Sequence, residues 1–321
     1  MHIRIIGTGL MALACSSLAC AQSAERARPQ EKAAATVKGK ARTQADVKPD
    51  GFGTVLPAGL NAKQLIALVA PGRDASFAML VGAKAWPYRA NSFVVIACFS
   101  RNEQDAERSR KASTGPSCDG TSRSGGAPAS IDPAVYFGVV EYQAGSAAPT
   151  LVASYGKPYD IKTSWAFSQV EGPGEDDEPP ASGQKGLMPE QYRRFDFAPY
   201  KITPMETAIG LRLGWNEGYA GGGADFEALS LLRIDGNKLV NILSEPVSFQ
   251  KLIAGDWNKD GTRQHDEYEG TNVLSVLPST TNGYADLQLR LLGSKSKQVF
   301  TWDSKRARYM LTRSSAPAKK R

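Results

Sequence analysis

The sequence predicts a mainly β protein, in which antiparallel strands are joined as hairpins and helices are few and short. Between residues 51 and 312 the apolar residues come in short runs, and Gly, Pro, Asn or Asp bounds most of these runs. Such punctuation is typical of strands and not of long helices. A sandwich, a barrel or a propeller-like arrangement agrees with this pattern.

Turn residues between the expected strands favour hairpins. The clearest apolar runs are residues 77–81, 93–99, 135–140, 151–155, 209–213, 229–234, 239–243, 273–277, 287–292, 299–302 and 309–312. Asp235-Gly236-Asn237-Lys238 separates two of these runs and Asn282-Gly283 separates two others, as in tight hairpins. One helix is expected over residues 61–69, where Asn61 caps the first turn. Thr203-Pro204-Met205-Glu206 also has the pattern of a helix start, from which we expect a single turn before a strand.

The chain of 321 residues has a formal net charge of +7, which first suggests a nucleic-acid or membrane-surface binder. Residues 22–50 carry seven Lys or Arg against four acids, and residues 313–321 carry four bases and no acid. Residues 51–312 hold 27 bases against 28 acids, so this part is nearly neutral. Both terminal segments are expected to be disordered basic tails, and contact with an anionic envelope surface is the alternative. Neither tail contains an aromatic residue for base stacking, so no nucleic-acid partner is expected.

Residues 1–21 have the organisation of a secretory signal peptide. Arg4 supplies the positive charge, residues 5–18 the apolar stretch, and Ala19-Cys20-Ala21 the cleavage site before Gln22. We therefore expect a periplasmic or secreted protein. A buried first strand or helix is one alternative, and lipid anchoring at Cys20 is another, because Ser17-Leu18-Ala19-Cys20 resembles a bacterial lipobox. No later stretch approaches the 18 or so apolar residues of a membrane-spanning helix.

Cleavage would leave two cysteines, Cys98 and Cys118, in an oxidising compartment. We predict a disulfide between them. It would close a loop rich in Arg, Ser, Gly and Asp and, in the chain-entropy model, stabilise it by about 3 kcal/mol. The alternative, a reactive or metal-binding thiol pair, needs neighbouring histidines or more cysteines, and the only histidines are His2 and His265.

An acidic segment interrupts the nearly neutral part of the chain. Residues 171–180 hold five acids among Gly and Pro, with no apolar residue. We expect residues 171–188 to be an acidic linker or a long surface loop between an N-terminal β-rich domain, residues 51–170, and a C-terminal one, residues 189–312. A calcium site or a site for a basic partner is the functional alternative.

Residues 256–267 give the strongest local signal, because they match the calcium-loop pattern D-x-[DN]-x-[DN]-G-x5-E at each fixed position. The match resembles the EF-hand loop and the D-x-N-x-D-G loops of secreted β-rich proteins. We expect a lone structural Ca2+ site between strands. Its ligands would be Asp256, Asn258, Asp260, Thr262, Gln264 and Glu267. Two alternatives stay open: an Asx-rich turn without metal, and a catalytic role for His265 with Asp266 or Glu267.

Residues 218–224 are rich in glycine and are expected at a hairpin tip between the strands at 209–213 and 229–234. They fit neither the P-loop nor the G-x-G-x-x-G pattern, which argues against a phosphate cradle. A loop on a rigid sheet can also carry binding. The second interpretation is therefore a recognition loop made by Trp215, Gly218, Tyr219, Gly221, Gly222, Gly223 and Phe226.

No catalytic signature stands out in the sequence. It contains no G-x-S-x-G elbow, and a Ser-His-Asp arrangement is possible only through His265. The paired carboxylates of a glycoside hydrolase need not be close in sequence, so Glu217, Asp225 and Glu227 are the acids to test first. The simpler interpretation of these acids is exposed polar positions near a hairpin.

The order of motifs in the C-terminal third is similar to that of certain exported proteins of Gram-negative bacteria. The G-D-x-N-x-D-G loop at 255–261 is followed by Val276-Leu277-Pro278, by Asn282-Gly283-Tyr284, by Phe300-Thr301-Trp302-Asp303 and by Tyr309. Over residues 250–312 this order resembles the calcium-loop β domains related to periplasmic lysozyme inhibitors and toxin-immunity proteins. The resemblance implies a non-enzymatic protein that blocks a cell-wall hydrolase by inserting a loop.

We therefore expect an exported, non-enzymatic binding or inhibitor protein of the cell envelope, stabilised by calcium and a disulfide. Its partner would be another envelope or secreted protein. The alternative is an exported hydrolase that acts through carboxylates and carries a structural calcium. A third hypothesis is a purely structural component of the envelope.

Overall fold

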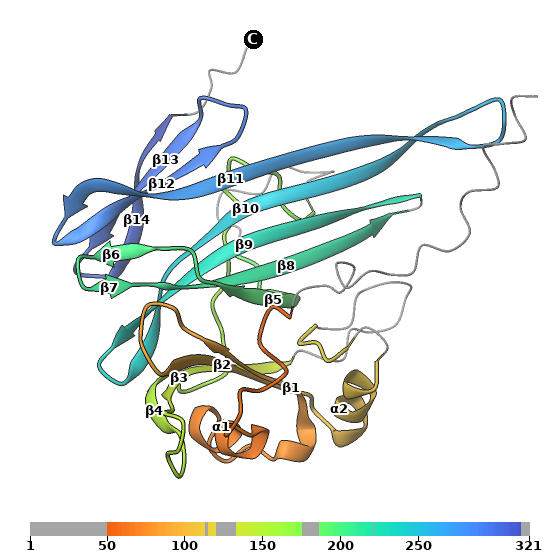
Figure 1. Ribbon diagram of the computed structural model, residues 1–321. Helices are drawn as coiled ribbons and strands as arrows, with labels where there is room; N and C mark the ends of the chain where they lie inside the picture. Colours follow the sequence, from red (N-terminus) through yellow and green to blue (C-terminus); the bar gives the residue numbers. More distant parts are fainter. Residues whose placement is uncertain (1–49, 113–114, 120–132, 175–185, 220, 316–321) are drawn as a thin grey trace, which may run out of the picture. The chain divides into compact units, whose positions relative to one another are not determined.

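The computed structural model describes residues 50–112, 115–119, 133–174, 186–219 and 221–315, and it confirms the mainly β fold (Figure 1). The helices are α1 (Ala62–Val69) and α2 (Glu103–Arg110), with a short 3-10 turn at Ala75–Phe77. The strands are β1 (Ala78–Ala85), β2 (Ser92–Phe99), β3 (Ala134–Glu141), β4 (Thr150–Ser154), β5 (Gln191–Asp196), β6 (Lys201–Thr203), β7 (Glu206–Thr207), β8 (Ile209–Tyr219), β9 (Gly222–Asp235), β10 (Lys238–Trp257), β11 (Arg263–Thr281), β12 (Tyr284–Leu291), β13 (Lys297–Asp303) and β14 (Arg308–Ser315).

One twelve-stranded sheet contains all strands except β6 and β7, which form a small hairpin of their own. Its main path runs β1-β2-β3-β4-β10-β11-β12-β13-β14. Off this path, β9 pairs with β10, β8 pairs with β9, and β5 pairs with β8. Neighbouring strands pair antiparallel, apart from β4 and β10, which meet in parallel at Ser154 and Lys238. The predicted hairpins at Asp235-Gly236 and Asn282-Gly283 are confirmed, since β9 turns into β10 and β11 into β12 there.

The helix predicted from Asn61 is confirmed as α1. The Asn61 side chain accepts a hydrogen bond from the Gln64 amide at 3.0 Å, which caps the first turn. Leu65, Ile66 and Val69 form its buried face. Helix α2 has no such face, because Ala106 is its only buried residue, and the apolar pattern therefore does not predict it.

The helical turn expected at Thr203-Pro204-Met205-Glu206 is wrong. Thr203 pairs with Glu206 across the β6–β7 hairpin, and the Thr203 hydroxyl accepts a hydrogen bond from the Met205 amide at 3.3 Å. The same residue types that begin a helix also suit a tight turn, and pairing between the two short strands decides the outcome here.

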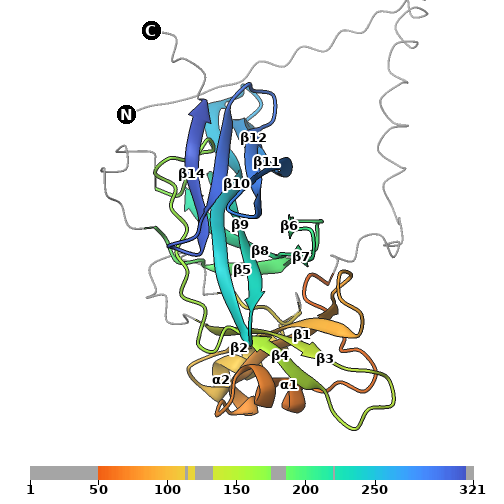
Figure 2. The same cartoon turned by 90° about the vertical axis from the view of Figure 1, so that its left-hand side faces the viewer.

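Both faces of β2 are buried, which explains its unbroken apolar sequence. Val94, Ile96 and Cys98 belong to a cluster shared with Phe137 and with β5, β8 and β9. The alternate residues Val95, Ala97 and Phe99 belong to a cluster shared with α1. A third cluster packs β9 and β10 against β12, β13 and β14. The strands are thus layered face to face, and Figure 2 shows α1 and α2 beside the β1–β4 layer.

The predicted disulfide is confirmed between Cys98, near the end of β2, and Cys118. Their Cα atoms are 5.7 Å apart and both residues are buried. The bond joins the segment 115–119 to the core cluster that contains Ala106 of α2.

Aromatic packing crosses the predicted boundary at residues 171–188. The ring of Phe137, before this segment, lies 6.0 Å from that of Tyr192 and 6.3 Å from that of Phe195, both after it. Residues 175–185 lie outside the described residues, and the division into two domains stays a prediction. The predicted signal peptide and the basic tail up to residue 49 also lie outside them. The predicted start of the C-terminal tail at residue 313 is wrong, because residues 313–315 still belong to β14 and pair with β13.

Candidate functional site: the β10–β11 arm

Strands β10 and β11 continue beyond their neighbours as a two-stranded arm, residues 253–269. β9 pairs with β10 as far as Gly223 opposite Leu252, and β12 pairs with β11 only from Asn272 onward. Between these limits, within the described residues, β10 and β11 pair only with each other. Figure 1 shows the arm running past the tip of the β8–β9 hairpin. A two-stranded ribbon buries little of its own surface, so its side chains remain available for contacts.

Most side chains of the arm are exposed to solvent. Every residue from Arg263 to Glu269 is exposed, and Trp257, at the end of β10, is 70% exposed. Tyr268 and Ile253 are the other large apolar side chains exposed here. Exposed aromatic side chains on a protruding element are available for contacts with a partner.

Arg263 holds Trp257 in place at the outer end of the arm. The two residues are opposite each other in the ladder, and the guanidinium carbon lies 5.4 Å from the centroid of the indole ring. The Arg263 Nε donates a hydrogen bond to the Gly255 carbonyl at 2.9 Å. A cation above an aromatic face is attracted by the ring electrons. The exposed indole is therefore ordered by its own strand partner.

The tip of the arm, residues 258–262, is closed by its own polar groups. The Asn258 amide donates to the Thr262 carbonyl at 2.7 Å. One Asp260 carboxylate oxygen accepts from the hydroxyl and the amide of Thr262 at 2.6 and 2.9 Å, and these bonds lower the pKa of Asp260 below its ordinary value. Gln264 Nε2 donates to the Asn258 side-chain oxygen at 3.0 Å. Gly261 supplies the positive φ, +83°, that the turn requires.

The predicted calcium ligands do not converge on one point in this conformation. Asp256 and Glu267 lie in strands, and Glu267 is opposite Leu252, five residues from Thr262 at the tip. Five residues of strand span about 17 Å, too far for Glu267 and Asp260 to share an ion. No group of three or more His, Cys, Asp or Glu among the described residues is placed to hold a metal. The geometry fits the Asx-turn alternative, and calcium binding stays a prediction.

The only histidine within the described residues, His265, lies in β11 opposite Ala254 and is exposed. Asp266 is its neighbour along the strand, so their side chains project from opposite faces. Within the part of the chain that the structure describes, no hydrogen bond joins His265 to Asp266 or Glu267. This arrangement lacks the aligned acid and base that the catalytic alternative needs.

The predicted recognition loop and the predicted calcium loop meet in space. A Cβ atom added to Gly221, beside the β8–β9 tip, would lie 3.0 Å from Ala254 Cβ and 3.1 Å from Arg263 Nη1. A Cβ atom on Gly222 would overlap the Leu252 carbonyl. The glycines therefore let the two hairpins pack closely. Gly218 and Tyr219 end β8, Gly223 continues β9, and the predicted hairpin tip is confirmed.

Two members of the predicted recognition loop are core residues, so a surface role for them is wrong. Trp215 is 2% and Phe226 is 1% exposed, and their rings lie 5.4 and 5.8 Å from that of Trp165. The Trp215 indole N–H donates to the Met188 carbonyl at 2.7 Å. Alternation along β8 and β9 turns both side chains to the covered face. The exposed aromatic side chain of this region is instead Trp257, which no sequence motif marks.

The acids Asp225 and Glu227 are engaged by arginines. Arg193 donates to both oxygens of Asp225, at 2.7 and 2.5 Å. Glu227, only 8% exposed, accepts from Arg212 at 2.9 Å and from Arg194 at 3.4 Å. Both carboxylates therefore hold β5, β8 and β9 together and do not form a free acid pair.

Asp196 completes this arginine network. Burial alone would raise its pKa, but Arg212 at 2.6 Å and hydrogen bonds from Ala198 and Tyr200 lower the pKa below its ordinary value. Burial alone would lower the pKa of Arg212. The nearby carboxylates of Asp196 and Glu227 outweigh this effect, so the pKa of Arg212 is raised. Both shifts favour the charged forms of Asp196 and Arg212, as a structural ion pair requires.

A shallow groove of about 370 Å3 lies at the base of the arm. Three carboxylates line it, those of Glu217, Asp225 and Glu267, together with Lys251 and Leu252. Lys251 pairs with Glu171 at 2.7 Å. The groove is continuous with β11 through Glu267.

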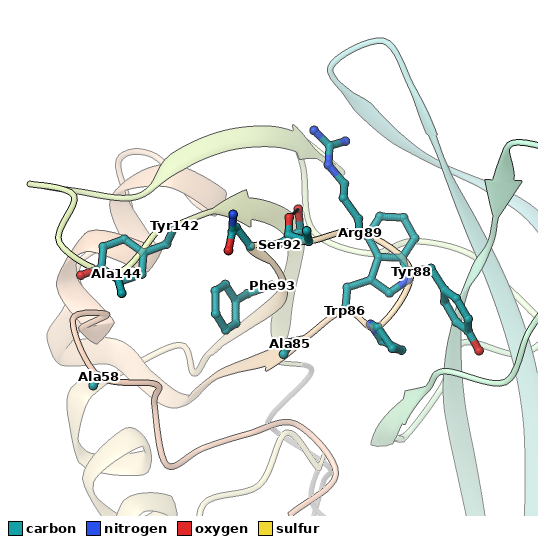
Figure 3. Close-up of a pocket in the computed structure, with 12 residues that line it drawn as sticks. Ala58, Ala85, Trp86, Tyr88, Arg89, Ser92, Phe93, Tyr142 and Ala144 are labelled. Atoms are coloured by element: carbon teal, nitrogen blue, oxygen red, sulfur yellow. Dashed lines mark hydrogen bonds between the residues drawn. The ribbon is translucent and has the colours of Figure 1, made fainter.

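A second hollow, of about 540 Å3, lies beside the β1–β2 turn (Figure 3). Trp86, Tyr88, Phe93 and Tyr142 line it. The Tyr88 hydroxyl donates to the Phe197 carbonyl at 2.9 Å, so this polar group serves the fold.

Comparisons of the chain with protein-family models, with curated proteins and with solved structures give no significant match. The resemblance to lysozyme inhibitors and immunity proteins therefore stays a prediction. Neither helix in the described part of the chain has the length and apolar character needed to cross a lipid bilayer.

Proposed function

We propose that this protein is an exported, non-enzymatic binding protein that inserts the β10–β11 arm into a partner protein of the cell envelope and inhibits it. The observation that carries the proposal is the arm itself. It is a ribbon exposed on both faces, with Trp257 at its outer end fixed by Arg263.

The side chains of the arm are of the kinds that dominate binding energies. Trp, Tyr and Arg are enriched among residues whose truncation weakens interfaces most, and Trp257, Tyr268 and Arg263 are of these kinds. Because the Trp257 ring is already ordered against Arg263, binding costs less side-chain entropy. The ribbon is also narrow, with strands about 5 Å apart, which suits entry into an enzyme cleft.

The disulfide between Cys98 and Cys118 supports export, because such bonds persist in oxidising compartments. The partner class, a cell-wall hydrolase, comes from the resemblance of residues 250–312 to periplasmic inhibitors. The hydrolase alternative has no comparable observation in its favour, since Asp225 and Glu227 are bound by arginines.

Inhibition assays test this proposal. Purified protein is added to a muramidase, an amidase and an endopeptidase acting on peptidoglycan, and the release of soluble fragments is measured. We expect inhibition of at least one enzyme, and an inhibition constant raised at least about tenfold by Trp257→Ala. Met205→Ala is the matched control, because Met205 is 95% exposed on the β6–β7 turn. Equal inhibition by the Trp257→Ala variant and the natural protein would show that the arm is not the inhibiting element.

A further inference from the structure

The outer edge of β11 has backbone groups that no other strand within the described residues uses. The Thr271 carbonyl accepts a hydrogen bond from the Leu292 amide at 2.8 Å, so Thr271 directs its backbone groups away from β10. These directions alternate along a strand, and the register with β10 is unbroken from His265 to Thr271. Glu269, Glu267 and His265 therefore also direct their N–H and C=O groups outward. In the described part of the chain, no strand pairs with this side of β11 before Asn272.

We infer that this edge, residues 264–270, binds an extended cationic strand of the partner protein, which adds to the sheet beside β11. The inference rests on the proposed function and names the mode of contact and the chemistry of the partner segment. An edge strand with free N–H and C=O groups is a template for an added strand, and the ladder supplies affinity without regard to sequence.

The side chains of the edge specify which strand fits. His265, Glu267 and Glu269 project from one face, and Asp266 and Tyr268 from the other. Residues directly opposite each other in an antiparallel pair share a face, so Lys or Arg opposite Glu267 and Glu269 forms charge pairs. An apolar residue between these bases lies beside Tyr268, which is 50% exposed. The fitting strand therefore alternates basic and apolar residues.

Charge excludes a second copy of this chain as the occupant. Residues 253–269 carry five acids against two bases. An antiparallel pair of two β11 edges centred on Glu267 would place Glu267 opposite Glu267, and like charges directly opposite are destabilising. A parallel pair in register would repeat the same clash along the edge.

A labelled peptide of nine residues, in which Lys and Val alternate, tests the inference without any hydrolase. Its binding to the purified protein is followed by fluorescence anisotropy. We expect saturable binding that weakens with salt and falls at least about tenfold in Glu267→Lys/Glu269→Lys. The charge-matched control is Glu103→Lys/Asp235→Lys, because both residues are exposed and outside the arm. Should the Lys pair fail to fold, as judged by circular dichroism, Glu267→Gln/Glu269→Gln replaces it.

Methylated peptides separate strand addition from simple charge attraction. The backbone groups of Glu267 and Glu269 point outward, so each peptide lysine opposite one of them bonds β11 through its own amide. N-methylation of the lysine amides should therefore abolish binding. N-methylation of the valine amides blocks the other edge of the peptide and should leave binding intact. Equal binding of the peptide methylated on lysine would overturn strand addition, and so would no binding of the unmodified peptide. A dimer of the protein that Glu267→Pro dissociates would identify a second copy as the occupant and also overturn the inference. None of these outcomes depends on Trp257, so the proposed inhibition stands or falls separately.

Discussion

Single residues in the arginine network on β5, β8 and β9 show how this sheet holds buried charge. Glu227 is 8% exposed, and Arg212 and Arg194 both contact it. A charge withdrawn from water is costly unless it is paired, whereas removal of one partner leaves the other charge unsatisfied. The network therefore fixes the strands that carry the β8–β9 hairpin beneath the arm.

The replacement Glu227→Gln tests this role. We expect a loss of about 2–4 kcal/mol in the free energy of unfolding, because Arg212 loses its buried counter-charge. Asp225→Asn is the matched control. The Asp225 side chain is 47% exposed, so its loss should cost about 0–1 kcal/mol. Urea unfolding of both variants measures the difference, and equal losses would contradict the structural role of Glu227.

Residues whose roles follow from local chemistry could be predicted from sequence alone. Asn61 caps a helix through its own side chain, and Cys98 and Cys118 are the only cysteines left after the expected cleavage. Tryptophans are harder, because strand register decides which face each one occupies. Trp215 is buried and Trp257 is exposed, although both are close to turn residues in the sequence.

At the scale of elements, apolar runs predict only those parts of a strand whose side chains are buried. β10 covers Lys238–Trp257, whereas its apolar run covers only 239–243, because the arm carries polar residues on both faces. β5 escapes prediction since Arg193 and Arg194 interrupt its apolar residues, Tyr192 and Phe195. The β10–β11 arm, on which the proposed function depends, is therefore formed by backbone pairing that no apolar pattern in the sequence indicates.

The strand β10 also carries a titratable group on its core face. Glu245 lies opposite Leu229, and burial raises its pKa to about 8, partly offset by Arg308. The native state then holds its proton between pH 4.5 and 8, where the unfolded chain releases it. The contribution of Glu245 to stability is therefore complete below pH 4.5 and is lost as the pH rises toward 8.

Glu245→Gln removes this dependence because the amide does not titrate. We expect the variant to match the natural protein at pH 4.5 and to exceed it at pH 8 by about 1–3 kcal/mol in the free energy of unfolding. Urea unfolding at both pH values measures this difference. A variant that is no more stable at pH 8 would show that water reaches the carboxylate.

The tip of the arm gives a separate prediction about calcium. Because Asn258, Asp260 and Thr262 already bond one another and Glu267 lies far from them, the tip closes without an ion. The Asx-turn alternative predicts an equal midpoint of thermal unfolding in excess calcium and in chelator. A midpoint that calcium raises in the natural protein but not in Asp260→Ala would instead establish the predicted calcium site.

For the whole molecule, the decisive arrangement is that one continuous strand joins the core to the arm. β10 packs Ile242, Leu243 and Val247 into the cluster shared with β12, β13 and β14, and its far end carries Trp257. A contact at the arm is therefore anchored in a buried cluster of the fold. Rigid support of this kind lowers the entropy cost of binding.

Amide hydrogen exchange of the free protein tests the central claim, an unpaired outer edge of β11, most directly. Along β11 we expect fast exchange at His265, Glu267 and Glu269, whose amides point outward, and slower exchange at Asp266 and Tyr268, whose amides bond β10. This alternation requires no knowledge of the partner. Equal and strong protection of all five amides would contradict the account, because it would mean that another part of the chain or a second copy already covers the edge.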